Sequence, residues 1–330
     1  MQEQPRQIII RSPNWLGDQI MALSFYQGVR ELFPESRIVC FRPYSLRGVL
    51  PSGLIDEDWE FKKEEIQKGS SRKEWIRKLK EGKFDISVSL TASWSSALLF
   101  YQAGIGSRLG FSQSGSGILL SSSLPWRGVK ANKHKSLLYR ELLHLLDAKA
   151  SLLDLPKTLS VKKSPEDFLV LAPGAALPLR EWPYFPELIF ELKRRYPERE
   201  IKVVGTHTES AWQSRLKRWN LPGVSDYIGK TSVSELINLC SKASLVIAND
   251  SGVAHLSATL SQVPTIVIFG PGNPSYIAPQ GPVVMPVKPA QLACSPCEKP
   301  YCRAPYGYQQ CLREIKIHDV LSAVEKALSL

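Results

Sequence analysis

The stretch that most constrains the fold lies in the second half of the chain, at residues 244–271. Residues 245–248 (Leu-Val-Ile-Ala) are an unbroken apolar run, typical of a strand buried on both faces of a parallel sheet. The run ends at residues 249–252 (Asn-Asp-Ser-Gly), which include good helix N-caps, so residues 253–260 are predicted to be helical. A second apolar run at 265–269 predicts the next strand. Such a strand–loop–helix–strand unit indicates a parallel α/β sheet.

The loop of this unit is a candidate ligand site. It follows the carboxyl end of a strand, where open α/β sheets bind ligands, and free amides at a helix N-terminus attract phosphate. An ordinary capped helix without a ligand explains the same residues, and this unit alone does not separate the two interpretations.

The N-terminus opens with a similar unit. Residues 7–11 predict a strand, residues 12–18 (Ser-Pro-Asn-Trp-Leu-Gly-Asp) a loop, and the following apolar residues, close to a 3.6-residue period, a helix that ends at Pro34. Residues 37–41 predict the second strand. Asp18 is therefore expected at the carboxyl end of a strand and the amino end of a helix. It is a candidate catalytic carboxylate; the alternative is a carboxylate that only caps the helix and meets its dipole.

The second half repeats this architecture, with strands predicted at 167–172 and 201–204 before the one at 245–248. Polar residues follow each strand, at Arg180, at Glu209 and at Asp250–His255. If these exits converge at one sheet edge they suit a nucleotide: a cation for phosphate, a carboxylate for ribose hydroxyls and a helix N-terminus for the diphosphate.

The chain has 330 residues, which is long for one hydrophobic core and predicts two domains. Residues 150–164 have no strong periodicity and are the predicted linker, giving domains 1–155 and 156–330. No apolar run is long enough to span a bilayer, and the first six residues lack the layout of a signal peptide, so a cytoplasmic protein is expected. The net charge of +11 favours an anionic partner: nucleic acid, an acidic membrane surface or a phosphorylated substrate.

Four further segments have competing interpretations. Residues 56–58 (Asp-Glu-Asp) resemble an acidic metal-binding triplet, but their surroundings favour a solvated surface loop. Residues 91–96 are rich in hydroxyls that suit either a polyhydroxylated ligand or a helix cap. The basic, partly aromatic segment 126–135 is either a solvated loop or a patch for an anionic acceptor. The glycines at 104, 106 and 110 are too loosely spaced for a dinucleotide-binding motif, which is excluded.

The cysteines carry a separate signal. Cys40 and Cys240 lie in apolar elements and are expected in the core. The other four form a C-x2-C-x4-C-x8-C pattern, which in a cytoplasmic protein favours a structural Zn²⁺ or an iron–sulfur cluster over disulfides. Free or transiently oxidised thiols are the alternative. The four residues are Cys294, Cys297, Cys302 and Cys311.

Several of these segments, taken together and in order, resemble one family. Residues 12–18, 173–175 (Pro-Gly-Ala), 180–183 (Arg-Glu-Trp-Pro), 249–255 (Asn-Asp-Ser-Gly-Val-Ala-His) and 269–271 (Phe-Gly-Pro) are similar to the ordered motifs of the ADP-heptose:lipopolysaccharide heptosyltransferases, glycosyltransferase family 9. The resemblance covers most of the chain. It implies the GT-B fold, in which two Rossmann-like parallel-sheet domains face each other across a cleft, the first binding the acceptor and the second the nucleotide sugar.

The resemblance also implies roles for particular residues. Asp18 stands at the position of the family's catalytic base, and Glu209 where a carboxylate binds the donor nucleoside. The family commonly has Lys where this chain has Arg180, so the contact of this residue with phosphate is expected to differ in geometry. The segment expected to hold the donor diphosphate and sugar contains Asp250, Ser251, Gly252 and His255.

The implied reaction is inverting transfer of a heptose from ADP-heptose, without a catalytic metal. The acceptor implied is an anionic, lipid-linked core oligosaccharide at the inner membrane, rather than nucleic acid, so a protein of charge +11 is expected to associate peripherally with that surface. Two other interpretations remain open: a nucleotide-sugar epimerase of the same fold, and a non-catalytic protein that binds an anionic glycan.

Overall fold

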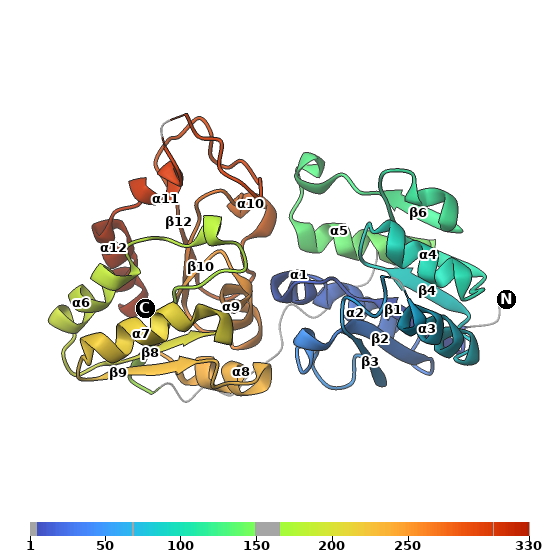
Figure 1. Cartoon of the computed structure of the whole chain (residues 1–330), viewed down its shortest axis with the longest axis horizontal. Helices are drawn as coiled ribbons and strands as arrows, with labels where there is room; N and C mark the ends of the chain where they lie inside the picture. The colour runs from blue at the N-terminus through green and yellow to red at the C-terminus, as the bar shows by residue number, and fades with distance from the viewer. Residues whose placement is uncertain (1–4, 68, 149–165, 306, 330) are drawn as a thin grey trace. The chain divides into compact units, whose positions relative to one another are not determined.

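A computed structural model describes residues 5–67, 69–148, 166–305 and 307–329. The chain divides into two compact units, residues 1–157 and 158–330 (Figure 1). The predicted linker at 150–164, and with it the boundary placed after residue 155, lies outside the described residues.

The first unit contains a six-stranded parallel sheet in the order β3-β2-β1-β4-β5-β6. This is the Rossmann order, with the topological switch point between the first and fourth strands. The strands are β1 (Gln7–Arg11), β2 (Arg37–Pro43), β3 (Glu57–Phe61), β4 (Ile86–Ser89), β5 (Ser107–Ser112) and β6 (Ser122–Pro125).

Helices cover both faces of this sheet. Buried side chains of α3 and α4 pack with those of β1, β2 and β3 in one core cluster. On the other face α2 packs against α5. The helices are α1 (Leu16–Met21), α2 (Leu23–Leu32), α3 (Ser70–Glu81), α4 (Trp94–Gln102) and α5 (Lys135–Glu141).

The second unit has a second six-stranded parallel sheet, in the order β12-β11-β10-β7-β8-β9. Numbered within the unit, this is again the Rossmann order, with the switch point between β7 and β10. The strands are β7 (Phe168–Ala172), β8 (Glu200–Gly205), β9 (Val224–Ile228), β10 (Leu245–Asn249), β11 (Thr265–Ile268) and β12 (Val284–Val287).

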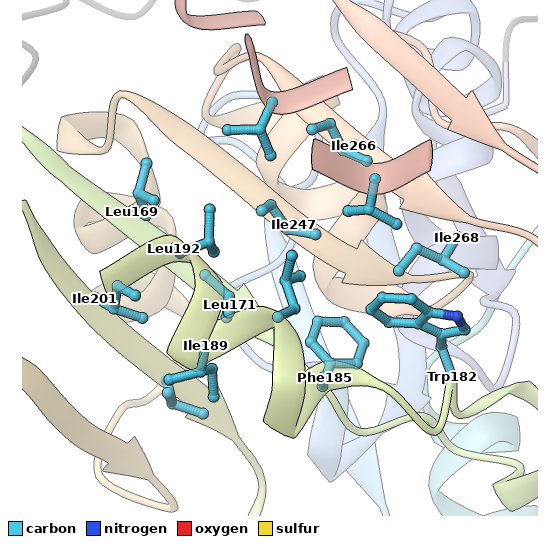
Figure 2. Close-up of a cluster of buried hydrophobic side chains, with 14 of the residues drawn as sticks. Leu169, Leu171, Trp182, Phe185, Ile189, Leu192, Ile201, Ile247, Ile266 and Ile268 are labelled. Carbon is cyan, nitrogen blue, oxygen red and sulfur yellow. The ribbon is translucent and has the colours of Figure 1, made fainter. Parts of the chain in front are cut away.

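One face of this sheet carries the larger core. Side chains of α6, α7 and α12 pack there against alternate residues of the strands, together with the rings of Trp182 and Phe185 (Figure 2). The indole N–H of Trp182 donates to the carbonyl of Ile315, 3.0 Å away, which satisfies the one polar atom of a ring that is almost fully buried. The helices are α6 (Phe185–Arg195), α7 (Ser210–Trp219), α8 (Val233–Lys242), α9 (Gly252–His255), α10 (Pro274–Ile277), α11 (Gln310–Glu314) and α12 (Ile317–Leu328).

The predicted α/β fold with two Rossmann-like parallel sheets is confirmed. The acidic triplet at 56–58 was wrongly assigned to a surface loop, because Glu57 and Asp58 begin β3 at the edge of the first sheet. Arginines neutralise this edge: Arg30 pairs with Asp56 at 2.6 Å, and Arg42 pairs with Asp58 at 2.6 Å. In the described part of the chain, no helix is long and apolar enough to cross a bilayer.

Candidate functional site

The candidate residues of each unit lie where its sheet topology predicts a ligand. Asp18 follows β1, one of the two strands at the first switch point. Arg180 follows β7 and Asp250 follows β10, the two strands at the second. In open α/β sheets the helices leave such a pair of strands in opposite directions, which opens a crevice at the carboxyl edge. Both units therefore present polar side chains at the edge that binds ligands in this fold.

Asp18 is held by a lysine from a distant part of the chain. It lies in the first turn of α1, but the N-cap of that helix is Trp15, so Asp18 is not the cap. Its Oδ1 accepts a hydrogen bond from Nζ of Lys135, the first residue of α5, at 2.7 Å. Both side chains are largely but not fully buried, with 20% and 15% of their surface exposed. The pair thus fixes a carboxylate that a ligand can still reach.

A buried arginine orders the loop that leads to Asp18. Arg11, the last residue of β1, donates to the carbonyl of Ser12 and to Oδ1 of Asn14, and its guanidinium lies 4.6 Å from the ring centroid of Phe61. Burial lowers the pKa of Arg11 to about 10, which leaves it charged at neutral pH. The turn between β1 and α1 is therefore tied to the core.

The second unit brings Arg180 and Asp250 together, as the sequence predicted for residues of converging strand exits. Nη1 of Arg180 donates to Oδ2 of Asp250 at 2.7 Å, and the carboxylate is buried. Nη2 of the same guanidinium lies 3.8 Å from the carboxylate of Glu298. A quarter of the arginine side chain is exposed, so the guanidinium is oriented by two carboxylates and remains accessible to an anion.

Asn249, the last residue of β10, binds the exit loop of β7 through two hydrogen bonds. Its side-chain oxygen accepts from the amide of Trp182 at 3.0 Å, and its side-chain amide donates to the carbonyl of Pro173 at 2.7 Å. The exit loop of β7 is thus attached to the end of β10 on both sides of Arg180. This explains why an Asn, with one donor and one acceptor arm, precedes Asp250.

A glycine turn closes around Asp250. A Cβ placed on Gly272 would lie only 2.3 Å from Oδ2 of Asp250, so the carboxylate occupies the space that any side chain there would need. The segment after Cys294 packs on the same turn: the amides of Cys297 and Glu298 both donate to the carbonyl of Pro271, at 3.0 and 2.9 Å. These contacts place Glu298 next to Arg180.

Glu209 lies on the other side of the β7 exit loop. Its carboxylate accepts from the amide and hydroxyl of Thr206 in a capping box, and it fills the space beside Gly174 and Gly205. Burial, with a smaller contribution from the charge of Glu209, raises the pKa of nearby Glu181. The structure thus places Glu209 in the 3-10 turn His207–Glu209, just after β8, the strand that pairs with β7. Its binding role stays a prediction.

The remaining predicted donor residues surround the start of α9. Ser251 is the N-cap and Gly252 the first residue of this helix, which continues through residues 256–260 in wider π-helical geometry. His255 is buried. The hydroxyl of Ser251 is buried too, and no atom of the described residues hydrogen-bonds to it. An unsatisfied buried hydroxyl beside an ion pair is a feature that a bound ligand would explain.

The four cysteines of the C-terminal segment are free thiols. Cys311 is buried beneath Gly270, and burial, with a smaller contribution from the other three thiols, raises its pKa to about 11. Among the residues that the structure describes, no group of three or more His, Cys, Asp or Glu side chains is arranged to hold a metal ion. A metal on Cys294, Cys297, Cys302 and Cys311 therefore stays a prediction.

Sequence reasoning missed two residues of these sites. Lys135 was grouped with a basic patch, although it is the partner of Asp18, and Glu298 was overlooked between two cysteines. Lys135 pairs with Asp18, which lies 117 residues earlier in the chain. Glu298 lies beside Arg180, which belongs to the loop after β7. In the sequence, Lys135 is marked only as the last residue of the basic segment 126–135, and Glu298 only as the residue after Cys297.

Comparison with known proteins identifies the family of the chain. Residues 72–306 match the model of glycosyltransferase family 9 (heptosyltransferase). The lipooligosaccharide heptosyltransferase 2 of Campylobacter jejuni serotype O:6 is 24% identical over 341 residues, covering 97% of this chain and 98% of the relative.

Solved structures of the same kind align with the whole chain. The ADP-heptose lipopolysaccharide heptosyltransferase II of Escherichia coli aligns with a TM-score of 0.78 and 21% identity, over 98% of both chains. The E. coli heptosyltransferase WaaC, solved with ADP, aligns with a TM-score of 0.73 and 17% identity, over 97% of this chain and 99% of WaaC. These likenesses confirm the GT-B fold class, and the match to the family model over most of the sequence shows that the chain belongs to glycosyltransferase family 9, the heptosyltransferases, and is a glycosyltransferase.

Proposed function

We propose that this enzyme transfers a heptose from ADP-heptose to the inner core of lipopolysaccharide, with inversion at the anomeric carbon. The names of its relatives support the heptosyl group and a lipooligosaccharide or lipopolysaccharide acceptor, and the ADP bound to WaaC supports the nucleotide. Membership of a glycosyltransferase family leaves the epimerase and the non-catalytic glycan-binding protein without support.

Asp18 is the general base of the proposed reaction. A sugar hydroxyl is a weak nucleophile, and a carboxylate that takes its proton during attack makes the oxygen reactive. The hydroxyl oxygen forms a bond to the anomeric carbon while the bond from that carbon to the diphosphate breaks, and the proton moves to Asp18. Lys135 holds the carboxylate through Oδ1, and the hydrogen bonds of the described residues leave Oδ2 available to receive the proton.

Arg180 stabilises the leaving group. As ADP departs, negative charge builds up on its diphosphate, and a guanidinium fixed in place offsets this charge without reorganisation. Asp250 and Glu298 orient the guanidinium before the donor arrives. Attack from the face opposite to ADP inverts the anomeric configuration.

The observation that carries the proposal is the placement of these groups: a fixed carboxylate at the switch point of one sheet and a fixed, accessible guanidinium at that of the other. The test is incubation with ADP-heptose and a lipopolysaccharide core that lacks heptose, followed by mass spectrometry. The acceptor is expected to gain one heptose with release of ADP. Transfer only from a different nucleotide sugar would contradict the donor assignment.

The acceptor's setting accounts for the charge of the protein. A phosphorylated, lipid-linked core presents a negative surface, and a net charge of +11 draws the enzyme toward it. We place the enzyme in the cytoplasm, peripherally associated with the inner membrane. Binding to vesicles of anionic lipid that weakens as salt is raised is the expected behaviour.

Transfer is expected to continue in the presence of EDTA, because Arg180 supplies positive charge at the diphosphate. The measurement compares initial rates with EDTA and with added Mg²⁺ or Mn²⁺. A rate that collapses in EDTA and returns with Mg²⁺ would show that the diphosphate needs a divalent cation. Asp56 and Asp58 would then be the first residues to replace, although arginines occupy both carboxylates here.

Gly272→Ala is expected to weaken ADP binding about tenfold, the equivalent of one charge-assisted hydrogen bond. The new methyl group would overlap Oδ2 of Asp250 and so displace the carboxylate that orients Arg180. Calorimetry with ADP measures the loss. The matched control is Gly106→Ala, where the added methyl meets no atom within 4 Å. Equal ADP affinity in both variants would show that the position of Asp250 does not matter to the donor.

A further inference from the structure

Several large aromatic side chains of the first unit are exposed to solvent, and three of them follow a strand of its sheet. Tyr44 comes directly after β2, Trp15 lies between β1 and α1, and Trp94 starts α4 after β4. Their exposed fractions are 58%, 59% and 43%. Half-buried Trp126 comes directly after β6. We call these four residues the aromatic row.

The strand ends that carry the aromatic row are aligned. Arg11 of β1 pairs with Phe41 of β2 and with Ser89 of β4. At the other side of the sheet Ser112 of β5 pairs with Pro125 of β6, and the amide of Trp126 continues this ladder at 2.9 Å. The aromatic residues therefore follow the same, carboxyl edge of the sheet in the order Tyr44, Trp15, Trp94, Trp126.

This row extends to either side of the catalytic base. Asp18 is one helical turn beyond Trp15 in α1. Lys135, which holds Asp18, also lies 5.7 Å from the ring centroid of Trp126. Strands in a sheet lie about 4.8 Å apart, so the four steps from β2 to β6 span roughly 19 Å. Several consecutive sugar units fit along that length.

Two of the rings are fixed while part of their surface stays open. The indole N–H of Trp94 donates to the carbonyl of Ser114 at 3.1 Å, which ties the ring to the loop after β5. Trp126 packs edge-on against Phe111, with ring centroids 4.8 Å apart. A fixed aromatic ring loses little conformational entropy when a ligand covers it, which favours binding.

The surroundings of Trp126 suit an anionic sugar. A pocket of about 220 Å³ lies beside this ring, and its charged lining residues are Arg127, Lys133 and Glu141. Lys133 is paired with Glu141, whereas Arg127 is exposed at the rim. Lys135 is likewise paired with Asp18, whereas no ion pair of the described residues involves Arg127, so this end of the row carries one excess positive charge. A phosphate or carboxylate on the sugar is therefore favoured there.

We propose that the aromatic row is an extended acceptor platform, on which consecutive sugars of the core oligosaccharide stack, with the anionic unit at Trp126 and Arg127. The proposal deepens the proposed function and rests on it, because it assigns the substrate of the base Asp18. Aromatic faces pair with the C–H faces of sugar rings, and flanking polar groups bind the hydroxyls and anionic groups, as in other ligand sites. The enzyme then binds several sugars of its acceptor, not only the one that reacts.

The test uses water-soluble, fully deacylated core oligosaccharides of two lengths, one short enough to cover only Trp15 and Trp94 and one that reaches the ends of the row. Tyr44→Ala and Trp126→Ala are expected to raise the acceptor KM about tenfold for the long oligosaccharide and less than twofold for the short one. Trp94→Ala is expected to raise it for both. The KM for ADP-heptose should stay within about twofold in all three variants, because the aromatic row belongs to the first unit and the donor groups belong to the second.

Tyr101→Ala is the matched control. Tyr101 is 54% exposed but lies in the last turn of α4, toward the opposite edge of the sheet, so this variant should behave as the parent with both oligosaccharides. Calorimetry with the long oligosaccharide alone provides a readout that does not depend on turnover. If the parent binds it but transfers nothing, the proposed function fails while the platform stands.

Two results would overturn the platform. One is equal loss of affinity with short and long oligosaccharides in the Tyr44 and Trp126 variants, which would indicate a general disturbance of the unit. The other is normal use of soluble oligosaccharides by these variants combined with weaker binding to anionic lipid vesicles. The exposed rings would then be anchors in the membrane interface.

Discussion

Asp18→Asn is expected to lower kcat by roughly 10²- to 10⁴-fold, the contribution of a general base to proton transfer. The amide keeps the size of the carboxylate and can still accept a hydrogen bond from Lys135, so the loop before α1 should keep its structure. Affinity for ADP should not change, because the donor groups belong to the other unit. Steady-state rates with saturating acceptor measure the first quantity and calorimetry the second.

Two variants of Lys135 test whether its positive charge is needed to position Asp18 for proton transfer. Lys135→Arg preserves a cation at Asp18 and should retain most of the activity, whereas Lys135→Met removes it and should lower kcat while donor KM stays unchanged. Near-normal turnover of Asp18→Asn would exclude Asp18 as the base. Its pairing with Lys135 would then only attach α1 to α5.

The central strands of both sheets could be predicted because they are buried on both faces, and such strands are continuous apolar runs in the sequence. β1, β7 and β10 are short apolar runs; polar residues follow β1 and β10 directly, and a Pro-Gly turn follows β7. Such bounded runs are typical of strands buried on both faces of a parallel sheet. The final helix, α12, has a comparable local signal, because its buried apolar residues recur at helical spacing.

The edge strands were harder to predict. β3 begins with the exposed residues Glu57 and Asp58, and arginines from α2 and β2 pair with Asp56 and Asp58 at this edge. β9 has only one fully buried residue, Ile228, so its pattern resembles a polar loop. Edge strands commonly carry charges that prevent pairing with other chains, and these charges make such strands hard to recognise from a hydrophobic pattern.

The local sequence predicts some residues of the site and not their partners. Asp18, Arg180 and Asp250 were found because each comes after a recognisable strand, and the order of residues along the chain then places them at the carboxyl edge of a sheet. Their partners were not found, because the pairing of Asp18 with Lys135 depends on how α5 returns across the sheet. The contact of Arg180 with Glu298 depends on how the cysteine segment packs on Pro271.

Arg180→Ala is expected to weaken ADP binding by about 10- to 150-fold, since a charge-assisted contact with phosphate is worth roughly 1.5–3 kcal/mol. The donor KM should rise by the same order. The change also removes a cation from the buried carboxylate of Asp250, and loss of one partner from a buried pair destabilises a protein. Thermal unfolding without ligand measures that second effect and separates it from the loss of ADP affinity.

Two further variants decide what Arg180 does. Arg180→Lys keeps the positive charge beside Asp250 and should recover much of the ADP affinity, although an ammonium cannot contact phosphate through two parallel hydrogen bonds. Arg194→Ala is the matched control, because Arg194 is an exposed arginine of the same unit that pairs only with Glu191 of its own helix among the ion pairs of the described residues. If Arg180→Ala bound ADP as tightly as Arg194→Ala does, the guanidinium would not contact the diphosphate. Its two carboxylate contacts would then serve to hold the exit loops of β7 and β10 together, and the charge of the leaving group would have to be met by the amides at the start of α9.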